Sequence, residues 1–154
     1  MNRKEHSFRF SGHLYNFTTD NGVFSKTGVD YGTMVLLEAV VTEPLSGAVL
    51  DLGCGYGVIS VVLKSLYPEC VVTSVDVNPR AVELTQLNCD QNQAECNVLV
   101  SDGFSQLKES SYDAVITNPP IRAGKKVIYQ MFDDAYTHLK HHGKLMLVIQ
   151  RKQG

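Results

Sequence analysis

The sequence lacks any run of roughly 18 consecutive apolar residues, which is about the length that a transmembrane helix needs. We therefore expect no membrane span. The first six residues are polar and no apolar segment follows them, which argues against a secretory signal peptide. Internal repeats and low-complexity segments are also absent. Because 44% of the residues are hydrophobic and 19% are charged, the composition is typical of a globular domain and not of a disordered chain.

Cysteine pairs with metal-binding spacing are missing as well. The four cysteines stand at positions 54, 70, 89 and 96. None of them form a C-x-x-C pair, and no histidine lies at zinc-finger spacing from them, so we predict no metal site. Three of the four lie in or beside apolar runs, which is typical of free thiols in a reducing cytoplasm.

Acidic and basic residues are segregated along the chain, although the net charge is only −2. Residues 30–113 contain twelve acidic side chains and three basic ones, whereas residues 122–152 contain seven basic side chains and two acidic ones. This pattern indicates a face that meets a polyanion, or else a solvated helix face followed by a basic tail.

Hydrophobic periodicity predicts a β-hairpin followed by alternating strands and helices. Continuous apolar strands between helices indicate a parallel sheet that is covered on both faces, and right-handed crossovers make such a sheet doubly wound. Ligands of these sheets bind beyond the carboxyl ends of the strands. In chain order, we expect a hairpin over 8–17, a helix over 30–41, a strand over 48–52, a helix over 58–67, a strand over 70–75, a helix over 79–91, strands over 98–100 and 112–117, a helix over 125–140 and a fifth strand over 144–150.

A glycine-rich loop follows the strand over 48–52. Gly53, Gly55 and Gly57 have the spacing G-x-G-x-G, and Val58 stands where a dinucleotide-binding loop has its third glycine. This spacing argues against NAD or FAD, and a P-loop is excluded because no Gly-Lys-Ser/Thr follows. The alternative for the loop is a tight strand–helix turn without a ligand.

An acidic residue stands at the end of each of three successive predicted strands: Asp51, Asp76 and Asp102. A carboxylate can accept two hydrogen bonds from a ribose diol, which favours a ligand contact for Asp76. The alternative for Asp76 is a helix N-cap before Pro79. The alternative for Asp102, which precedes Gly103, is an ordinary turn.

The strand over 112–117 ends at Asn118, Pro119 and Pro120. The two prolines remove two backbone donors, so the side-chain oxygen of Asn118 and the carbonyl of Pro119 remain as acceptors. These acceptors suit a planar exocyclic amine, because they direct the nitrogen lone pair toward an electrophile and stabilise positive charge on the nitrogen. The alternative is a turn that only ends the strand.

In their order and spacing, these motifs resemble those of class I S-adenosylmethionine-dependent methyltransferases. The segments over 22–33 and 118–125 are similar to the small-domain group that is related to ribosomal RNA small-subunit guanine-N2 methyltransferases. The resemblance implies S-adenosylmethionine as the cofactor and a catalytic turn at Asn118, Pro119 and Pro120. The cofactor-binding residues that it implies are Asp51, Gly53, Gly55, Asp76, Asp102 and Asn118.

The function implied by this resemblance is N-methylation of the exocyclic amine of guanine in ribosomal RNA. Substrate-binding residues would be Phe24, Arg122, Lys125 and Lys126. Many adenine- and glutamine-methylating relatives carry an aromatic residue after the second proline, whereas this chain has Ile121. The alternatives are methylation of protein glutamine, DNA adenine or a small amine, or a truncated, inactive module that holds cofactor or RNA.

We divide the chain into an N-terminal hairpin and lid segment, residues 1–29, and an S-adenosylmethionine-binding methyltransferase domain, residues 30–154. The hairpin either covers the site, with Phe24 stacking on a flipped base, or contributes its aromatic residues to a small satellite core. The sheet of class I methyltransferases usually has seven strands, and this sequence ends just after the fifth. We therefore expect the last two strands to be lacking, with the fifth strand as an apolar edge through which copies self-associate.

Overall fold

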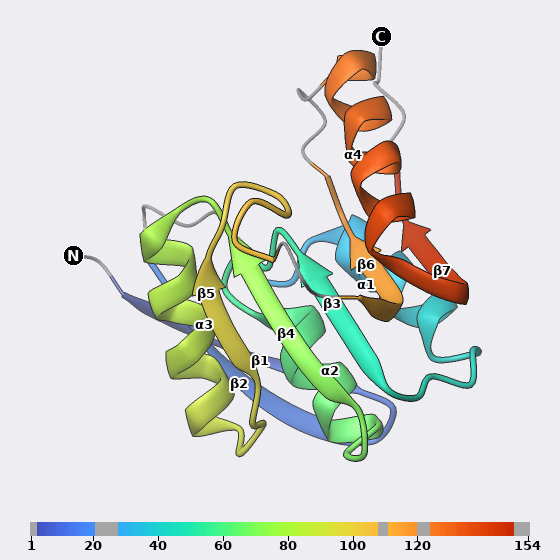
Figure 1. The fold of residues 1–154 in the computed structure, drawn as a ribbon. Coiled ribbons are helices and arrows are strands. Elements are labelled where there is room, and N and C mark those ends of the chain that lie inside the picture. Colours follow the sequence, from blue (N-terminus) through green and yellow to red (C-terminus); the bar gives the residue numbers. More distant parts are fainter. Residues whose placement is uncertain (1–2, 21–27, 108–110, 120–123, 150–154) are drawn as a thin grey trace, which may run out of the picture.

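The computed structural model describes residues 3–20, 28–107, 111–119 and 124–149. Figure 1 shows a central sheet with helices packed on it and an N-terminal hairpin beside the helices. The order of elements confirms the predicted alternation. The elements are β1 (Lys4–Phe10), β2 (His13–Thr19), α1 (Tyr31–Val40), β3 (Ala48–Leu52), α2 (Val58–Leu66), β4 (Val71–Asp76), α3 (Pro79–Gln91), β5 (Asn97–Val100), β6 (Tyr112–Thr117), α4 (Gly124–His138) and β7 (Leu139–Leu147).

The central sheet has the strand order β5-β4-β3-β6-β7, and every neighbouring pair is parallel. The chain first builds the sheet outward from β3 to β5 and then returns to add β6 and β7 on the other side of β3. The order therefore reverses at β3 and β6, and ligands of open α/β sheets bind at such a reversal, outside the carboxyl ends of the strands. The predicted doubly wound α/β fold with an N-terminal hairpin is confirmed.

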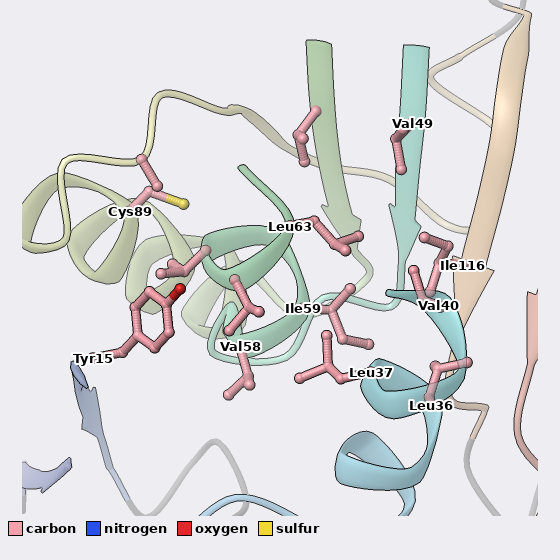
Figure 2. Close-up of a cluster of buried hydrophobic side chains, with 14 of the residues drawn as sticks. Tyr15, Leu36, Leu37, Val40, Val49, Val58, Ile59, Leu63, Cys89 and Ile116 are labelled. Carbon is pink, nitrogen blue, oxygen red and sulfur yellow. The ribbon is translucent and has the colours of Figure 1, made fainter. Parts of the chain in front are cut away.

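Each face of the sheet has its own apolar cluster, which is centred on β3, β4 and β6. The hairpin, α1, α2 and α3 cover one face, and Figure 2 shows part of this cluster around Leu37, Ile59 and Leu63. On the other face, Ala135 and Met131 of α4 pack with Leu50 and Val115. Within the described ranges, no helix combines the length and the apolar character that a membrane crossing requires.

The hairpin is anchored to α2 and α3. Phe17 is fully buried and Tyr15 nearly so, and the Tyr15 hydroxyl donates to Ser65 Oγ at 2.9 Å. The Asn88 amide accepts from the backbone N–H of Thr18 at 2.7 Å and donates to the Thr18 carbonyl at 2.9 Å. The described aromatic residues of the hairpin therefore pack in the main core and do not form the separate satellite core that we considered. Phe24 lies outside the described residues, so the lid and the boundary at residue 29 stay predictions.

The prediction for the last strand was wrong in its bounds. We expected residues 144–150, whereas β7 begins at Leu139, directly after α4, and ends at Leu147. Leu139 pairs with Tyr112 and packs in the second apolar cluster, and the register then shifts before Lys144 pairs with Ala114. The four residues between these pairs face a single residue of β6, so the strand bulges there. Polar residues 140–142 carry no apolar alternation, which is why the sequence pattern missed this part of the strand.

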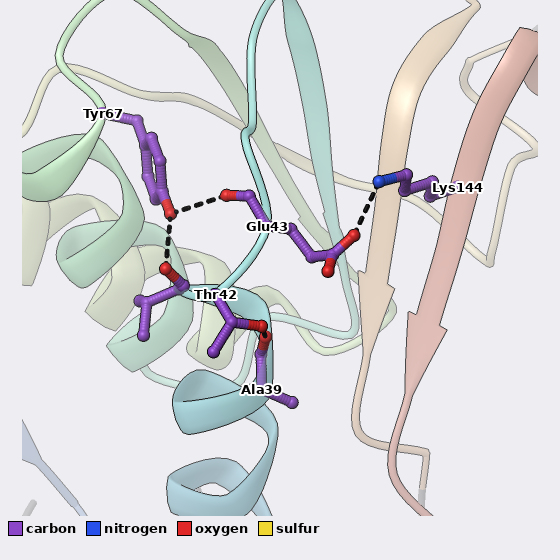
Figure 3. A network of polar contacts seen from close by, with 6 residues as sticks. Ala39, Thr42, Glu43, Tyr67 and Lys144 are labelled. Atoms are coloured by element: carbon purple, nitrogen blue, oxygen red, sulfur yellow. Dashed lines mark hydrogen bonds and ion pairs between the residues drawn. The ribbon is translucent and has the colours of Figure 1, made fainter.

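Polar contacts tie the segment between α1 and β3 to its neighbours (Figure 3). Glu43 and Lys144 of β7 form an ion pair at 2.6 Å. The Tyr67 hydroxyl donates to the backbone carbonyls of Val41 and Glu43. Because the ion pair is well exposed, it contributes at most about 1 kcal/mol. In the described sheet β7 is an edge strand, and self-association through it stays a prediction.

Candidate functional site

A cavity of about 580 Å³ lies at the carboxyl ends of the sheet strands, where the strand order reverses. Its volume is in the usual range for a site that holds a small organic ligand. The strand ends form its floor and α4 forms one wall. Its lining residues are Leu52, Gly53, Val75, Asp76, Val77, Ser101, Asp102, Gly103, Thr117, Asn118, Pro119, Val127, Ile128, Gln130, Met131 and Asp134.

The glycine loop after β3 passes beside this cavity with a left-handed backbone. Gly53 and Gly55 have φ values of 79° and 58°, and a Cβ atom built on either would meet no atom within 4 Å. The space beside both residues is therefore open to a ligand, and Gly53 itself lines the cavity. At Gly57, a Cβ atom would lie only 3.2 Å from Thr85. Gly57 therefore serves the close packing of α2 on α3.

Asp76 is fixed at the carboxyl end of β4 by two backbone groups. Its Oδ2 accepts from Gly55 N at 2.9 Å, and its Oδ1 accepts from Asn78 N at 3.0 Å. The N-cap of α3 is Asn78, whose side chain accepts from Arg80 N, so the N-cap alternative for Asp76 was wrong. An ionised carboxylate has about four acceptor sites. Asp76 thus retains acceptor capacity toward the cavity that it lines.

Asp102 lies on a turn at the cavity rim, after β5. Its backbone N–H donates to Ser105 Oγ at 3.1 Å, and its carbonyl accepts from Ser105 N. Ser101 Oγ closes the same turn by donating to the Gly103 carbonyl at 2.7 Å. These bonds hold the backbone while the exposed Asp102 carboxylate makes no bond within the turn. The turn and the ligand contact predicted for Asp102 are therefore compatible.

Asp51 lies on the far side of the sheet from α4. Side chains alternate along β3, so Asp51 shares a face with Val49 and contacts α2, where its Oδ2 accepts from Ser60 Oγ at 2.6 Å. The residue is only 1% exposed and its Oδ1 has no hydrogen-bond partner. Burial raises the pKa of Asp51 to about 7, because the interior disfavours the charged form. Asp51 and Gly55 do not line the cavity, so their direct contact with a cofactor stays a prediction.

The turn after β6 brings Asn118 and Pro119 to the cavity. Asn118 Nδ2 donates to Asp30 Oδ2 at 3.0 Å and to Thr33 Oγ1 at 3.1 Å. An amide has two donor hydrogens on its nitrogen, and these two contacts can use both of them. The oxygen of the Asn118 amide is then left as an acceptor, as the predicted chemistry requires.

The remaining sequence-predicted residues are only partly described. Pro120, Arg122 and Phe24 lie outside the described residues. Lys125 and Lys126 are exposed on the first turn of α4 and do not line the cavity. No cluster of three or more metal-ligating side chains occurs in the described part of the chain.

The wall formed by α4 is a part of the site that sequence reasoning missed. Val127, Met131 and Asp134 line the cavity from one side of the helix, and Gln130 Nε2 donates to Asp134 Oδ1 at 3.1 Å. Their spacing of i, i+4 and i+7 marks one helix face. That spacing was the available signal, but periodicity alone does not tell whether such a face meets a core or a cavity.

Known proteins are similar to this chain in sequence and in fold. The methyltransferase small domain family matches residues 14–154. "Uncharacterized protein YbxB" of Bacillus subtilis is 42% identical over 155 residues, which cover 99% of this chain and 77% of that protein. Ribosomal RNA small subunit methyltransferase C of Aliivibrio fischeri is 36% identical over 149 residues, which cover 94% of this chain and 43% of the relative.

A solved structure with the same fold is a 16S rRNA N2 methyltransferase of T. thermophilus, in complex with AdoMet and guanosine. The TM-score is 0.85 and the identity is 30%, and the match covers 94% of this chain and 41% of that chain. The chain therefore spans less than half the length of these two ribosomal RNA methyltransferases.

Proposed function

The chain belongs to the methyltransferase small domain family, and from this premise we propose that it transfers a methyl group from S-adenosylmethionine to the exocyclic amine of guanine in ribosomal RNA. The observation that carries the proposal is the orientation of Asn118. Its amide nitrogen is engaged by Asp30 and Thr33, so its oxygen is the acceptor left for a substrate amine at the cavity.

The cavity has the hydrogen-bond acceptors and the open space that S-adenosylmethionine needs. The open side of Gly53 allows close approach of a ligand to the loop backbone. Asp76, which two backbone N–H groups hold in place, would accept from the ribose hydroxyls, and Asp102 would accept from the adenine amino group. When bound, the cofactor supplies an electrophilic methyl group.

The Asn118-Pro119 turn would bind and orient the acceptor amine. The Asn118 side-chain oxygen and the Pro119 carbonyl each accept one N–H of the amine, which fixes the direction of the nitrogen lone pair. Positive charge develops on that nitrogen during methyl transfer, and the same two oxygens stabilise it. The reaction then needs neither a metal nor a covalent enzyme intermediate.

The ribosomal RNA substrate is supported by the relatives and by the charge of the chain. Methyltransferase C acts on small-subunit ribosomal RNA by its name, and the T. thermophilus structure contains guanosine. Lys125 and Lys126 are exposed at the start of α4, whose later turns wall the cavity, and they are placed to contact phosphate groups. A ribosomal RNA substrate also fits the cytoplasmic location that four free thiols favour.

Methyl transfer from radiolabelled S-adenosylmethionine to bulk RNA, DNA and protein tests this proposal. We expect the label in RNA, and digestion to nucleosides should place it on the exocyclic nitrogen of guanosine. Label in protein or DNA would favour a glutamine or an adenine acceptor. If calorimetry detects cofactor binding but no acceptor is labelled, the chain is a cofactor-binding module and the proposal is wrong.

Replacing Lys125 and Lys126 together by alanine should weaken RNA binding without changing cofactor affinity. With fewer phosphate contacts, RNA binding releases fewer counterions. The slope of log K against log salt should therefore become less steep by about 1 to 2. Fluorescence anisotropy with labelled RNA at several salt concentrations measures both quantities. The matched control replaces Lys4 and Arg9, two exposed basic residues of the hairpin. An equal loss in the control would contradict the assignment to α4.

A further inference from the structure

Two residues at the start of α1 contact the amide of Asn118, although 88 and 85 positions separate them from it in sequence. Asp30 immediately precedes the helix, and Thr33 is in its first turn. Their oxygens lie 3.0 Å and 3.1 Å from Asn118 Nδ2. The start of α1 and the end of β6 therefore meet at the edge of the cavity through one amide group.

Asp30 occupies the N-cap position of α1 but does not cap the helix. Aspartate is among the favoured N-cap residues because its carboxylate accepts from the free N–H groups of the first turn. Here the backbone of Asp30 is extended, as a cap requires, yet its side chain makes no capping hydrogen bond. The carboxylate is instead directed at Asn118 Nδ2. A group suited to helix capping is thus used for a contact at the site.

The chemistry of the carboxylate determines which end of the amide faces it. An ionised carboxylate only accepts hydrogen bonds, so Asp30 selects the nitrogen of Asn118 and turns the oxygen away. The bond is also charge-assisted and therefore stronger than one between neutral groups.

We propose that Asp30 and Thr33 are positioning residues for methyl transfer, which select and hold the orientation of Asn118 in which its oxygen accepts from the substrate amine. This inference rests on the proposed function, because it assigns to Asn118 the role of amine acceptor. Neither residue needs to touch the substrate or the cofactor. Loss of their contacts with Asn118 should lower the transfer rate and leave cofactor affinity unchanged.

Exchanging the carboxylate of Asp30 and the amide of Asn118 between the two positions tests the proposal. Asn118→Asp alone places two carboxylates against each other, and we expect methyl transfer to RNA to fall about 100-fold, as on loss of one transition-state hydrogen bond. When Asp30→Asn is combined with Asn118→Asp, the new amide at position 30 can donate to one carboxylate oxygen and leave the other for the amine. The double variant should transfer methyl groups at least about 10-fold faster than Asn118→Asp. The single variant Asp30→Asn completes the double-mutant cycle, which expresses this gain as coupling.

The matched control is Glu38→Gln, which removes one exposed carboxylate from the same helix and should retain the parent rate. Cofactor affinity, measured by calorimetry, should be the same in all variants. A double variant no faster than Asn118→Asp would overturn the positioning role. If Asn118→Ala also transfers methyl groups at the parent rate, the proposed function of the turn has failed instead.

A second measurement does not depend on finding the acceptor. The side-chain amide of Asn118, assigned in NMR spectra by its absence from Asn118→Ala, should be rigid on the ps–ns timescale in the parent protein. It should become mobile in Asp30→Ala, and Glu38→Gln should leave it rigid. Equal order parameters for this amide in the parent and in Asp30→Ala would refute the inference, even for a chain that methylates nothing.

Discussion

Asn118→Ala is expected to lower the rate of methyl transfer to RNA about 100-fold or more, the typical loss when one transition-state hydrogen bond is removed. The oxygen of Asn118 is proposed to bind the acceptor amine, and alanine offers no acceptor in its place. The family resemblance also places Asn118 among the cofactor-binding residues, but cofactor affinity should remain nearly intact, because the ribose and adenine contacts are assigned to Asp76 and Asp102. Single-turnover rates with radiolabelled S-adenosylmethionine, together with calorimetric titration of the cofactor, separate the two effects.

The control with the opposite pattern is Asp76→Ala. Loss of charged hydrogen bonds to the ribose should weaken cofactor binding by about 1.5–3 kcal/mol, while the transfer rate at saturating cofactor changes less than in Asn118→Ala. A parent-like rate for Asn118→Ala would mean that Asn-Pro-Pro is only a strand-ending turn. Unchanged cofactor affinity in Asp76→Ala would remove the ribose assignment.

Asp51→Asn is expected to make the protein more stable than the parent at pH 8, and the gain should shrink as the pH falls. Burial raises the pKa of Asp51 from 3.8 to about 7, so the native state retains this proton in a pH range where the unfolded chain has lost it. The contribution of Asp51 to the free energy of unfolding is therefore most favourable below about pH 4 and is lost as the pH rises toward 7. Asparagine has nearly the same shape and does not ionise.

The size of this effect follows from the pKa difference. Each unit corresponds to about 1.4 kcal/mol, so the stability difference between variant and parent should increase by about 3 kcal/mol from pH 5 to pH 8. Urea denaturation of both proteins at several pH values measures it. Other titrating groups, such as Asp113, whose pKa the Ala48 N–H and Lys140 lower, are common to both proteins and cancel. Parallel pH profiles would show that Asp51 does not carry a raised pKa.

Local patterns in the sequence determined most of the fold and the location of the candidate site. The apolar segments and helical periodicities predicted the order of strands and helices, and Pro79 marked the start of α3 correctly. The G-x-G-x-G spacing and the acids at the carboxyl ends of β4 and β5 pointed to the carboxyl edge of the sheet, where Gly53, Asp76 and Asp102 do line the cavity. These features were predictable because strand ends, turns and caps depend on a few adjacent residues.

The tertiary structure alone decided which side chains meet. Asp51 lies on the side of β3 that contacts α2, so its side chain points away from the cavity and its unpartnered oxygen is buried. Packing of α4 on the sheet makes Met131 a cavity wall, and pairing of Leu139 with Tyr112 moves the start of β7. The contact of Asp30 with Asn118 arises because α1 packs at the end of β6. A contact across 88 residues depends on strand order and helix packing, which local periodicity does not encode.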